Sequence, residues 1–385
     1  MLRGEQTLSN VVASQIPTHS PYGGVVPELA SREHLRNIVP VVRAALAQAG
    51  MRMDQIDAIA VTEGPGLAGS LLVGITYAKS LALGLGKPLI AVNHLEGHIH
   101  AVLLEQRELQ SAASDGNPGK RHLDPPLPGQ SIPVLALVVS GGHTHLYLAR
   151  RGNAGTENDA PWLYQNVGRT IDDAAGEAFD KVSKLLALGY PGGPWIDALA
   201  PHGDPKTVPF TFAQIKTKVH RPGARAALPR FLFSFSGIKT AVLRYVETHN
   251  LKASIDARRD ALAAIQNPMP ADALPFCDAE TLGLIASFQR AVVGDLMRKT
   301  FQATETYEAG SILVSGGVAA NRELRVRFTA EAAEHGVSIA FPSLALSTDN
   351  AAMIAAAAWP KWLSGEFAPD RLSAEPSLKL GTVFP

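Results

Sequence analysis

The motif Asn-His-Leu-Glu-Gly-His at residues 93–98 places two histidines four positions apart. On a helix this spacing puts both imidazole rings on one face, close enough to bind one ion. Neutral imidazole suits zinc or ferrous iron. The pair could instead be ordinary surface or core histidines, and His100 could replace one of them. The motif directly follows the apolar residues 88–92, however, and α/β sheets hold ligands at the carboxyl ends of buried parallel strands. We therefore expect His94 and His98 to be ligands of a functional metal site.

A metallopeptidase is the obvious alternative for paired histidines. The zincin motif needs a glutamate directly after the first histidine, where this chain has Leu95. The inverted motif needs a glutamate directly before the second histidine, where it has Gly97. A metallopeptidase is therefore not expected. A stable site needs a third ligand, and Asp349 in the motif Ser-Thr-Asp-Asn at 347–350 offers a carboxylate. Taken alone, that motif is more typical of a helix N-cap.

Two glycine pairs follow apolar segments and could approach an anion. Residues 139–144, Val-Ser-Gly-Gly-His-Thr, join two expected strands. Paired glycines let backbone N–H groups come close to a phosphate, although an ordinary hairpin turn explains them equally well. Residues 315–321, Ser-Gly-Gly-Val-Ala-Ala-Asn, follow an apolar strand and open a helix, whose N-terminus favours anions. Asn321 could donate to a base or ribose there, or simply cap the helix.

Two charged stretches are ambiguous when taken alone. Residues 172–181 carry four carboxylates, and Glu177 and Asp180 would share one face of a helix. The two aspartates at 172 and 173, expected in its first turn, would complement the helix dipole. Residues 205–246 contain no acid but several lysines, arginines and phenylalanines. That stretch could hold a phosphate backbone, or be a solvated face over core phenylalanines.

Composition favours a large protein without disulfides. The chain has 385 residues, of which 46% are hydrophobic and 18% charged, with a net charge of +0. This length favours two domains or lobes. One cysteine, Cys277, excludes an internal disulfide framework and a thiolate zinc finger. We find neither a signal peptide nor an apolar run of about 18 residues, the length that spans a bilayer. We therefore expect a cytoplasmic protein that contacts no membrane.

Apolar periodicity predicts alternating strands and helices, which is typical of an α/β protein with a parallel sheet. In the first part of the chain it predicts strands over 7–15, 56–62 and 88–92 and helices over 27–49 and 69–83. In the second part it predicts strands over 134–139, 143–150, 162–167, 311–314 and 337–341, with helices within 172–188, 236–248, 280–305, 321–335 and 349–359.

The pattern restarts after a stretch rich in glycine and proline, residues 107–132, which we interpret as a linker or insertion. We expect an N-terminal lobe over 1–106 and a C-terminal lobe over 133–345, with a second insertion near 249–279. Residues 346–385 would form a helix and tail that return to the lobe interface.

The order of these motifs is more specific than any one of them. Over residues 8 to about 380 the chain resembles the tRNA N6-adenosine threonylcarbamoyltransferase family (TsaD, formerly called O-sialoglycoprotein endopeptidase). The motifs that carry the resemblance are Tyr-Gly-Gly-Val-Val-Pro-Glu at 22–28, Asn-His-Leu-Glu-Gly-His at 93–98, Val-Ser-Gly-Gly-His-Thr at 139–144, Asp-Ala-Ala-Gly-Glu-Ala-Phe-Asp at 173–180, Tyr-Pro-Gly-Gly-Pro at 190–194, Phe-Ser-Phe-Ser-Gly at 233–237, Gly-Gly-Val-Ala-Ala-Asn at 316–321 and Ser-Thr-Asp-Asn at 347–350.

The resemblance implies an actin-like, two-lobed fold of the sugar-kinase and heat-shock-ATPase superfamily that closes on a nucleotide. It implies one divalent ion per subunit, iron or zinc, bound by His94, His98 and Asp349. Glu177 is our candidate general base. The residues implied to bind threonylcarbamoyl-AMP are Val139, Ser140, Gly141, Gly142, His143, Asp180, Gly193, Asp197 and Asn321.

The implied reaction transfers the threonylcarbamoyl group from threonylcarbamoyl-AMP to N6 of adenosine 37 in tRNAs that read codons beginning with adenine. The implied partners are an inactive paralogue subunit (TsaB-like) and a small ATPase subunit (TsaE-like). Two alternatives stay open. An actin-fold kinase or ATPase would not need the metal site, and an inactive scaffold subunit would be expected to lack the paired histidines.

The chain departs from the family pattern at its start. The family begins with a strand, an acidic and hydroxyl-rich turn and a second strand, and we find none of these. We therefore expect the first lobe to lack its first two strands, which would leave buried strand edges without partners. We expect this form to be a truncated product or to start at a misplaced codon, with reduced stability. Equal melting of an upstream-extended form would contradict that expectation.

Overall fold

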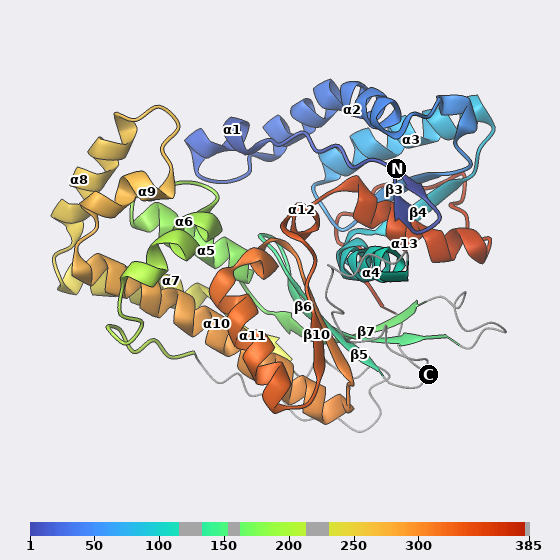
Figure 1. Ribbon diagram of the computed structural model, residues 1–385. Coiled ribbons are helices and arrows are strands. Elements are labelled where there is room, and N and C mark those ends of the chain that lie inside the picture. Colours follow the sequence, from blue (N-terminus) through green and yellow to red (C-terminus); the bar gives the residue numbers. More distant parts are fainter. Residues whose placement is uncertain (115–132, 153–161, 213–230, 382–385) are drawn as a thin grey trace.

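The computed structural model describes residues 1–114, 133–152, 162–212 and 231–381. Figure 1 shows two bodies stacked one above the other, with α4 (His94–Ser114) between them. The upper body holds β3, β4, α2, α3 and α13, and the lower body holds a larger sheet with its helices. Residues 115–132, the remainder of the expected linker, lie outside the described residues.

The upper body is built on a parallel pair of strands, β3 (Ile59–Gly64) and β4 (Leu89–Asn93). One face packs against α3 (Ala68–Leu85), on which α2 (Pro27–Ala49) lies. On the other face, Ile90 and Val92 pack with apolar residues of α4 and of α13 (Ala351–Leu363). This arrangement brings α13, which comes late in the chain, back to the first body.

The lower body contains a six-stranded mixed sheet. Its order is β10 (Ser338–Ala340), β9 (Ser311–Ser315), β5 (Val134–Val139), β6 (Thr144–Arg151), β7 (Trp162–Thr170) and β8 (Phe231–Phe233). Strand β5 runs parallel to β9 and antiparallel to β6. All its side chains are buried, because alternate residues face α4 on one side and the main helical layer on the other.

The main helical layer carries most of the larger core. It consists of α5 (Ala175–Leu185), α6 (Gly192–Leu199), α7 (Ser236–Thr248), α8 (Lys252–Ala263), α9 (Pro270–Ala273), α10 (Ala279–Tyr307) and α11 (Arg322–Glu334). Short elements complete the described chain: β1 (Leu2–Arg3), β2 (Gln6–Thr7), α1 (Ile16–His19), α12 (Leu344–Ser347), and the single 3-10 turns η1 (Ser20–Tyr22), η2 (Met53–Gln55), η3 (Ala200–His202), η4 (Leu274–Phe276) and η5 (Gly317–Ala320).

Most predicted elements are confirmed, and the bounds of α2, β5 and α7 agree with the prediction residue for residue. The strand predicted over 7–15 is wrong. Only β2 forms there, paired with β1, and no strand covers residues 8–15. A strand needs a partner for its backbone groups. Within the described part of this body β3 and β4 pair with each other, and neither pairs with residues 8–15.

Three further expectations differ in detail. Helix α4 continues to Ser114, so the expected linker begins as helix. The two aspartates at 172 and 173 precede α5 instead of forming its first turn. Residues 249–279, expected to be an insertion, hold α8 and α9, and Ile255 and Leu262 of α8 are buried in the main core.

One helix meets the length and composition of a membrane span, against the expectation that none would. Helix α3 has 18 residues with a mean hydropathy of 1.4, and 17% of them are buried. A single helix of this kind is weak evidence for a membrane. Leu72 and Leu83 are 58% and 87% exposed, so α3 presents an uncovered apolar face.

Candidate functional site

The metal candidate begins where β4 passes directly into α4. His94 is the first residue of the helix, and His98 follows one turn later on the same face. Asn93 makes the junction, since its side-chain oxygen accepts a hydrogen bond from the Leu95 amide at 2.9 Å. The strand thus delivers both histidines at its carboxyl end, as the sequence predicted.

Asp349 reaches the histidines from just before α13, about 250 residues later. The motif does cap α13, through Asn350, whose side-chain oxygen accepts from the Met353 amide at 3.0 Å. Capping therefore does not occupy Asp349, which stays available as a ligand. Gly97 allows the helices to come close, because a Cβ there would lie 2.8 Å from Cδ1 of Ile354.

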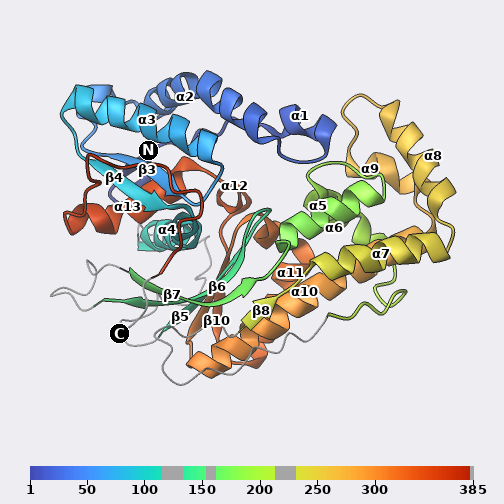
Figure 2. The ribbon, with the colours of Figure 1, turned by 180° about the vertical axis from the view of Figure 1, so that it is seen from behind.

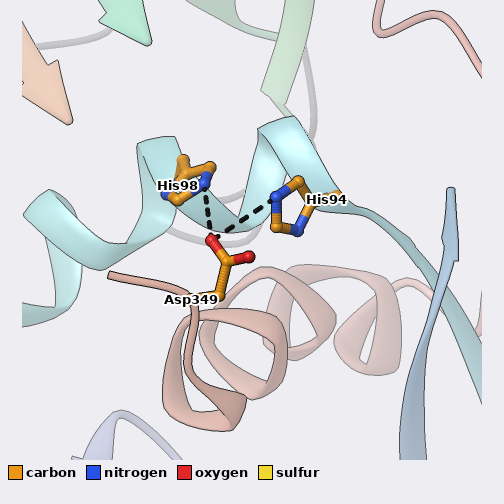
Figure 3. Close-up of side chains that lie close together, drawn as sticks. All are labelled: His94, His98 and Asp349. Atoms are coloured by element: carbon orange, nitrogen blue, oxygen red, sulfur yellow. Dashed lines mark ion pairs between the residues drawn. The ribbon is translucent and has the colours of Figure 1, made fainter. Parts of the chain in front are cut away.

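The three side chains converge on one point (Figure 3). Oδ1 of Asp349 lies 3.6 Å from Nε2 of His94 and 3.3 Å from Nε2 of His98. One ligand atom from each residue falls within 4.8 Å of the others. His100 is excluded from this group, since its Nε2 lies 3.0 Å from the hydroxyl of Tyr164 in the interior.

These residues fit a divalent transition metal. His98 is fully buried, and neither of its ring nitrogens makes a well-formed hydrogen bond. Unsatisfied buried nitrogens are costly, and an ion at this point would satisfy one of them. Two imidazoles and a carboxylate are a donor set for zinc or ferrous iron. The Asp349 side chain is 75% exposed, so a substrate can approach from that side.

The charges at this centre suit metal binding at neutral pH. Burial lowers the pKa of His94, although the charge of Asp349 opposes the shift. Burial and the neighbouring histidines lower the pKa of His143 to about 4. Burial would raise the pKa of the Asp349 carboxyl, but the close approach of His98 and the other imidazoles holds it well below its usual range. Neutral imidazoles and a charged carboxylate are the ligand forms.

The glycine turn between β5 and β6 lies next to this centre. The Ser140 amide donates to the His143 carbonyl at 2.8 Å, and the ring of His143 lies 6.1 Å from that of His94. Gly141 and Gly142 are exposed, and a Cβ at either would meet nothing within 4 Å. The first turn of α5 presses against this turn, because a Cβ on Gly176 would lie 2.6 Å from the Ser140 carbonyl oxygen.

Asp180 joins α5 to the start of α6. Its Oδ1 accepts a hydrogen bond from the Gly192 amide at 2.7 Å, which lowers the pKa of this carboxyl. Burial has the larger and opposite effect, so the pKa is raised above its usual value. Gly192 permits the contact, since a Cβ there would lie 2.5 Å from the Phe179 carbonyl oxygen. Gly193 faces open space. The two helices therefore form one wall beside the glycine turn.

The start of α11 contacts α6. The Asp197 carboxylate accepts from Arg322 twice, from the amide at 3.1 Å and from Nε at 2.9 Å. Asn321 is the N-cap of α11, as one of the two alternatives predicted, and accepts from the Leu324 amide at 2.9 Å. Its Nδ2 donates to Oε1 of Gln289 at 2.7 Å.

The family model for TsaD, described as tRNA N6-adenosine threonylcarbamoyltransferase, matches residues 6–117 and 121–356. The chain belongs to this family.

Relatives of the same description confirm the assignment. A tRNA N6-adenosine threonylcarbamoyltransferase from Koribacter versatilis is 60% identical over 379 residues, which cover 98% of this chain and 94% of the relative. One from Symbiobacterium thermophilum is 43% identical over 379 residues, covering 98% and 92%. A crystal structure of full-length HypF, in its phosphate- and nucleotide-bound form, has a TM-score of 0.50 at 12% identity. It covers 86% of this chain and 42% of that one, and supports the fold alone.

In this TsaD family member most of the predicted site residues lie close together. Glu177, the candidate general base, is instead paired with a lysine. Oε1 of Glu177 lies 2.9 Å from Nζ of Lys181 on the next turn of α5. Lys181 also lies 2.6 Å from Asp173. The Glu177 carboxylate is thus engaged in an ion pair with Lys181, and its role as a base stays a prediction.

Gln289 of this family member escaped the sequence analysis, and Asp172 has a different role from the one expected there. Gln289 is 2% exposed on α10 and accepts a hydrogen bond from Asn321, while its Nε2 donates to Glu323 at 3.1 Å. Asp172 accepts from the hydroxyls of Ser234 and Ser236 at 2.5 and 2.8 Å and so fixes the start of α7. Both contacts join segments far apart in the chain, which sequence spacing does not show.

The basic stretch over 205–246 lies partly outside the described residues. Within the described part, the phenylalanines at 231, 233 and 235 are buried in the main core, and those at 210 and 212 pack against it. The alternative of core phenylalanines is therefore confirmed for these positions.

Proposed function

We propose that this TsaD family enzyme transfers a threonylcarbamoyl group from threonylcarbamoyl-AMP to N6 of an adenosine in tRNA and releases AMP. The observation that carries the proposal is the convergence of His94, His98 and Asp349 beside the exposed glycine turn at 140–143. The family match over nearly the whole chain supports the same reaction. The target is adenosine 37 of tRNAs that read codons beginning with adenine.

The reaction replaces the mixed anhydride bond between the carbamoyl group and the phosphate by a carbon–nitrogen bond. N6 of the adenosine uses its lone pair to form a bond to the carbamoyl carbon. The bond from that carbon to the phosphate oxygen breaks, and AMP leaves with the electron pair. N6 loses one proton to water, so atoms and charge balance. The energetic demand is to hold the two reactants in line and to stabilise negative charge on the carbonyl and the departing phosphate.

We propose that His94, His98 and Asp349 hold one iron or zinc ion in each subunit. When bound, such an ion supplies a Lewis acid that orients and polarises the carbamoyl group. Asp349 is open on one side, which leaves room for the substrate. Burial lowers the pKa of His94, which favours the neutral imidazole that binds a metal.

The chain's own groups would bind the adenylate. Residues 139–143 would offer the backbone N–H groups of Gly141 and Gly142 to the phosphate, since nothing covers them. Asp180 and Asp197 each keep lone pairs beyond their contacts with Gly192 and Arg322, and these can accept ribose hydroxyls. Asn321 retains one amide hydrogen for the ligand. Gly193 leaves open space at the start of α6.

A two-lobed actin-like arrangement accounts for this placement. We assign the lobes to 1–106 and 133–345, with 107–132 as linker, an insertion near 249–279, and 346–385 returning to the lobe interface. Strands from both bodies and α13 meet around the site, which supports this division. The described parallel sheet of the first lobe consists of β3 and β4.

Family likeness also supplies the expected partners, a paralogue subunit and a small ATPase subunit, and a cytoplasmic location. We assign the exposed apolar face of α3 to the paralogue subunit, because Leu72 and Leu83 have no cover within the described chain. Leu83→Glu should prevent co-elution with that subunit and leave the fold intact by circular dichroism. Unchanged co-elution would place the paralogue elsewhere.

Single-turnover transfer from threonylcarbamoyl-AMP to tRNA tests the proposal. Asp180→Ala removes the carboxylate that joins α5 to α6 and should slow transfer by about a hundredfold or more, as expected for a lost positioning group. Gly237→Ala, in open space on α7, is the matched control and should leave the rate unchanged. Normal transfer by Asp180→Ala would remove this residue from the site.

A further inference from the structure

Tyr22 is an exposed aromatic residue that the proposed reaction does not use. It belongs to the motif at 22–28, directly before α2, and is 57% exposed. Within the described residues its hydroxyl makes no hydrogen bond and its ring stacks on no other ring. A single exposed apolar side chain is common on protein surfaces, and Tyr22 is distinguished by the support of its backbone and by the charge beside it.

The backbone around Tyr22 is firmly held. The buried His19 accepts from the Val26 amide through Nδ1 at 3.3 Å, and its Nε2 lies 3.2 Å from Oε1 of Gln15. With Nδ1 accepting, Nε2 carries the hydrogen and donates to Gln15. Gly23, at φ 67°, ends the 3-10 turn η1 in a left-handed conformation that favours glycine. The ring is therefore presented by a fixed turn.

This turn lies at the rim of the proposed site. Nζ of Lys184 on α5 donates to the Tyr22 carbonyl at 3.2 Å, one turn beyond Asp180. In both Figures 1 and 2, α1 and the start of α2 lie above α5 and α6 and bridge the two bodies. Further along α2, burial lowers the pKa of His34. The nearby charge of Asp349 has a smaller and opposite effect on that pKa, so this helix lies close to the metal candidate.

The charge beside the ring suits a polyanion. Lys184 is exposed and, among the described residues, forms no ion pair, so its side chain is available to a phosphate beside its bond to a carbonyl. Arg32 on the first turns of α2 is instead paired with Glu28. A single-stranded nucleic acid that reaches the site can thus place a base on Tyr22 and a phosphate near Lys184.

We propose that Tyr22 is a stacking platform for a nucleotide of the tRNA anticodon loop next to the adenosine that is modified. This inference rests on the proposed function. Unstacked loop bases bind readily to aromatic faces, and the interaction tolerates different bases because each has a π face. A protein partner on the same ring is the competing occupant, and the experiment below separates the two.

The test uses the full chain in its reconstituted complex, with four variants. Tyr22→Ala removes the ring, Tyr22→Leu keeps apolar bulk without a ring, and Tyr22→Phe keeps the ring without the hydroxyl. Val25→Ala is the matched control, because Val25 lies in the same segment and is 54% exposed. The measurements are the KM for tRNA, the KM for threonylcarbamoyl-AMP, kcat at saturating tRNA, and binding of an anticodon stem–loop RNA by fluorescence anisotropy.

We expect Tyr22→Ala and Tyr22→Leu to weaken stem–loop binding and raise the KM for tRNA by about tenfold, the usual effect of one stacked base. The kcat, the KM for the adenylate and the melting temperature should stay unchanged, and Tyr22→Phe and Val25→Ala should resemble the wild type. Unchanged RNA binding by Tyr22→Ala, full binding by Tyr22→Leu, or loss of complex assembly in place of RNA affinity would each overturn the inference. Failure of the wild type to modify tRNA would refute the proposed function. The anisotropy measurement would still decide whether Tyr22 contributes to RNA binding.

Discussion

Gly176→Ala is the substitution whose effect follows most directly from the contact between α5 and the glycine turn. A Cβ at this position would lie 2.6 Å from the Ser140 carbonyl oxygen and 2.8 Å from both N and Cα of Gly141. All three are backbone atoms, so no side-chain rotation relieves the overlap. Either α5 or the turn at 140–143 must move, and the move would tilt the exposed N–H groups proposed to hold the phosphate.

The magnitude combines two opposing terms. Overpacking a tight contact costs about 1–3 kcal/mol, and replacing glycine by alanine in a helix returns up to about 1 kcal/mol. We therefore expect Gly176→Ala to lower the free energy of unfolding by about 1–2 kcal/mol. Because the turn shifts, we also expect the KM for threonylcarbamoyl-AMP to rise, whereas the KM for tRNA should change little.

Gly237→Ala is the matched control. Gly237 is likewise the second residue of its helix, α7, but a Cβ there meets nothing within 4 Å. This variant should be as stable as the wild type or slightly more stable, because only the helix-propensity term remains. Urea unfolding and adenylate kinetics of both variants measure the difference. If Gly176→Ala matches Gly237→Ala in stability and in adenylate KM, α5 does not position the turn.

Three other outcomes follow from the site and its surroundings. His98→Ala should lower the bound metal per subunit, measured by inductively coupled plasma mass spectrometry, to well below the wild-type value, whereas an equal metal content would exclude His98 as a ligand. Asp172→Ala should destabilise the protein by about 1–2 kcal/mol in urea, because it leaves the start of α7 uncapped, and unchanged stability would mean that the cap is redundant. Burial, followed by the charges of His143 and Arg169, lowers the pKa of His145 from 6.5 to about 4. Since the unfolded chain then binds more protons, His145 should contribute to a loss of stability as pH falls from about 6.5 to about 4, and His145→Gln should flatten that part of the urea stability profile.

Elements with long, regular apolar patterns were predictable from the sequence. The helix over 27–49 and the strand over 134–139 appear with the predicted bounds. Both are decided by local periodicity and by end signals such as Pro27 and Gly50. The strand over 7–15 failed for the opposite reason. A strand exists only if another strand satisfies its backbone, and residues 8–15 find none within the described chain. Apolar content alone could not show this.

The site residues show the same difference between local and long-range signals. The pair His94 and His98 was predictable because both lie within one helical turn. The place of Asp349 depended on how α13 packs on α4, and on Asn350, not Asp349, being the cap. Gln289, which holds Asn321, had no local signal at all. Contacts between distant segments carry most of the geometry of this site, so beyond His94 and His98 the sequence could assign its residues only through family likeness.

Mass spectrometry of tRNA nucleosides tests the central claim most directly. The purified chain is incubated with threonylcarbamoyl-AMP, its partner subunits and unmodified tRNA that reads codons beginning with adenine. We expect N6-threonylcarbamoyladenosine to form together with an equal amount of AMP, and we expect His98→Ala to abolish both products. Stable complexes that release no AMP and leave the adenosine unmodified would contradict the account and leave this chain as a scaffold subunit of the same fold.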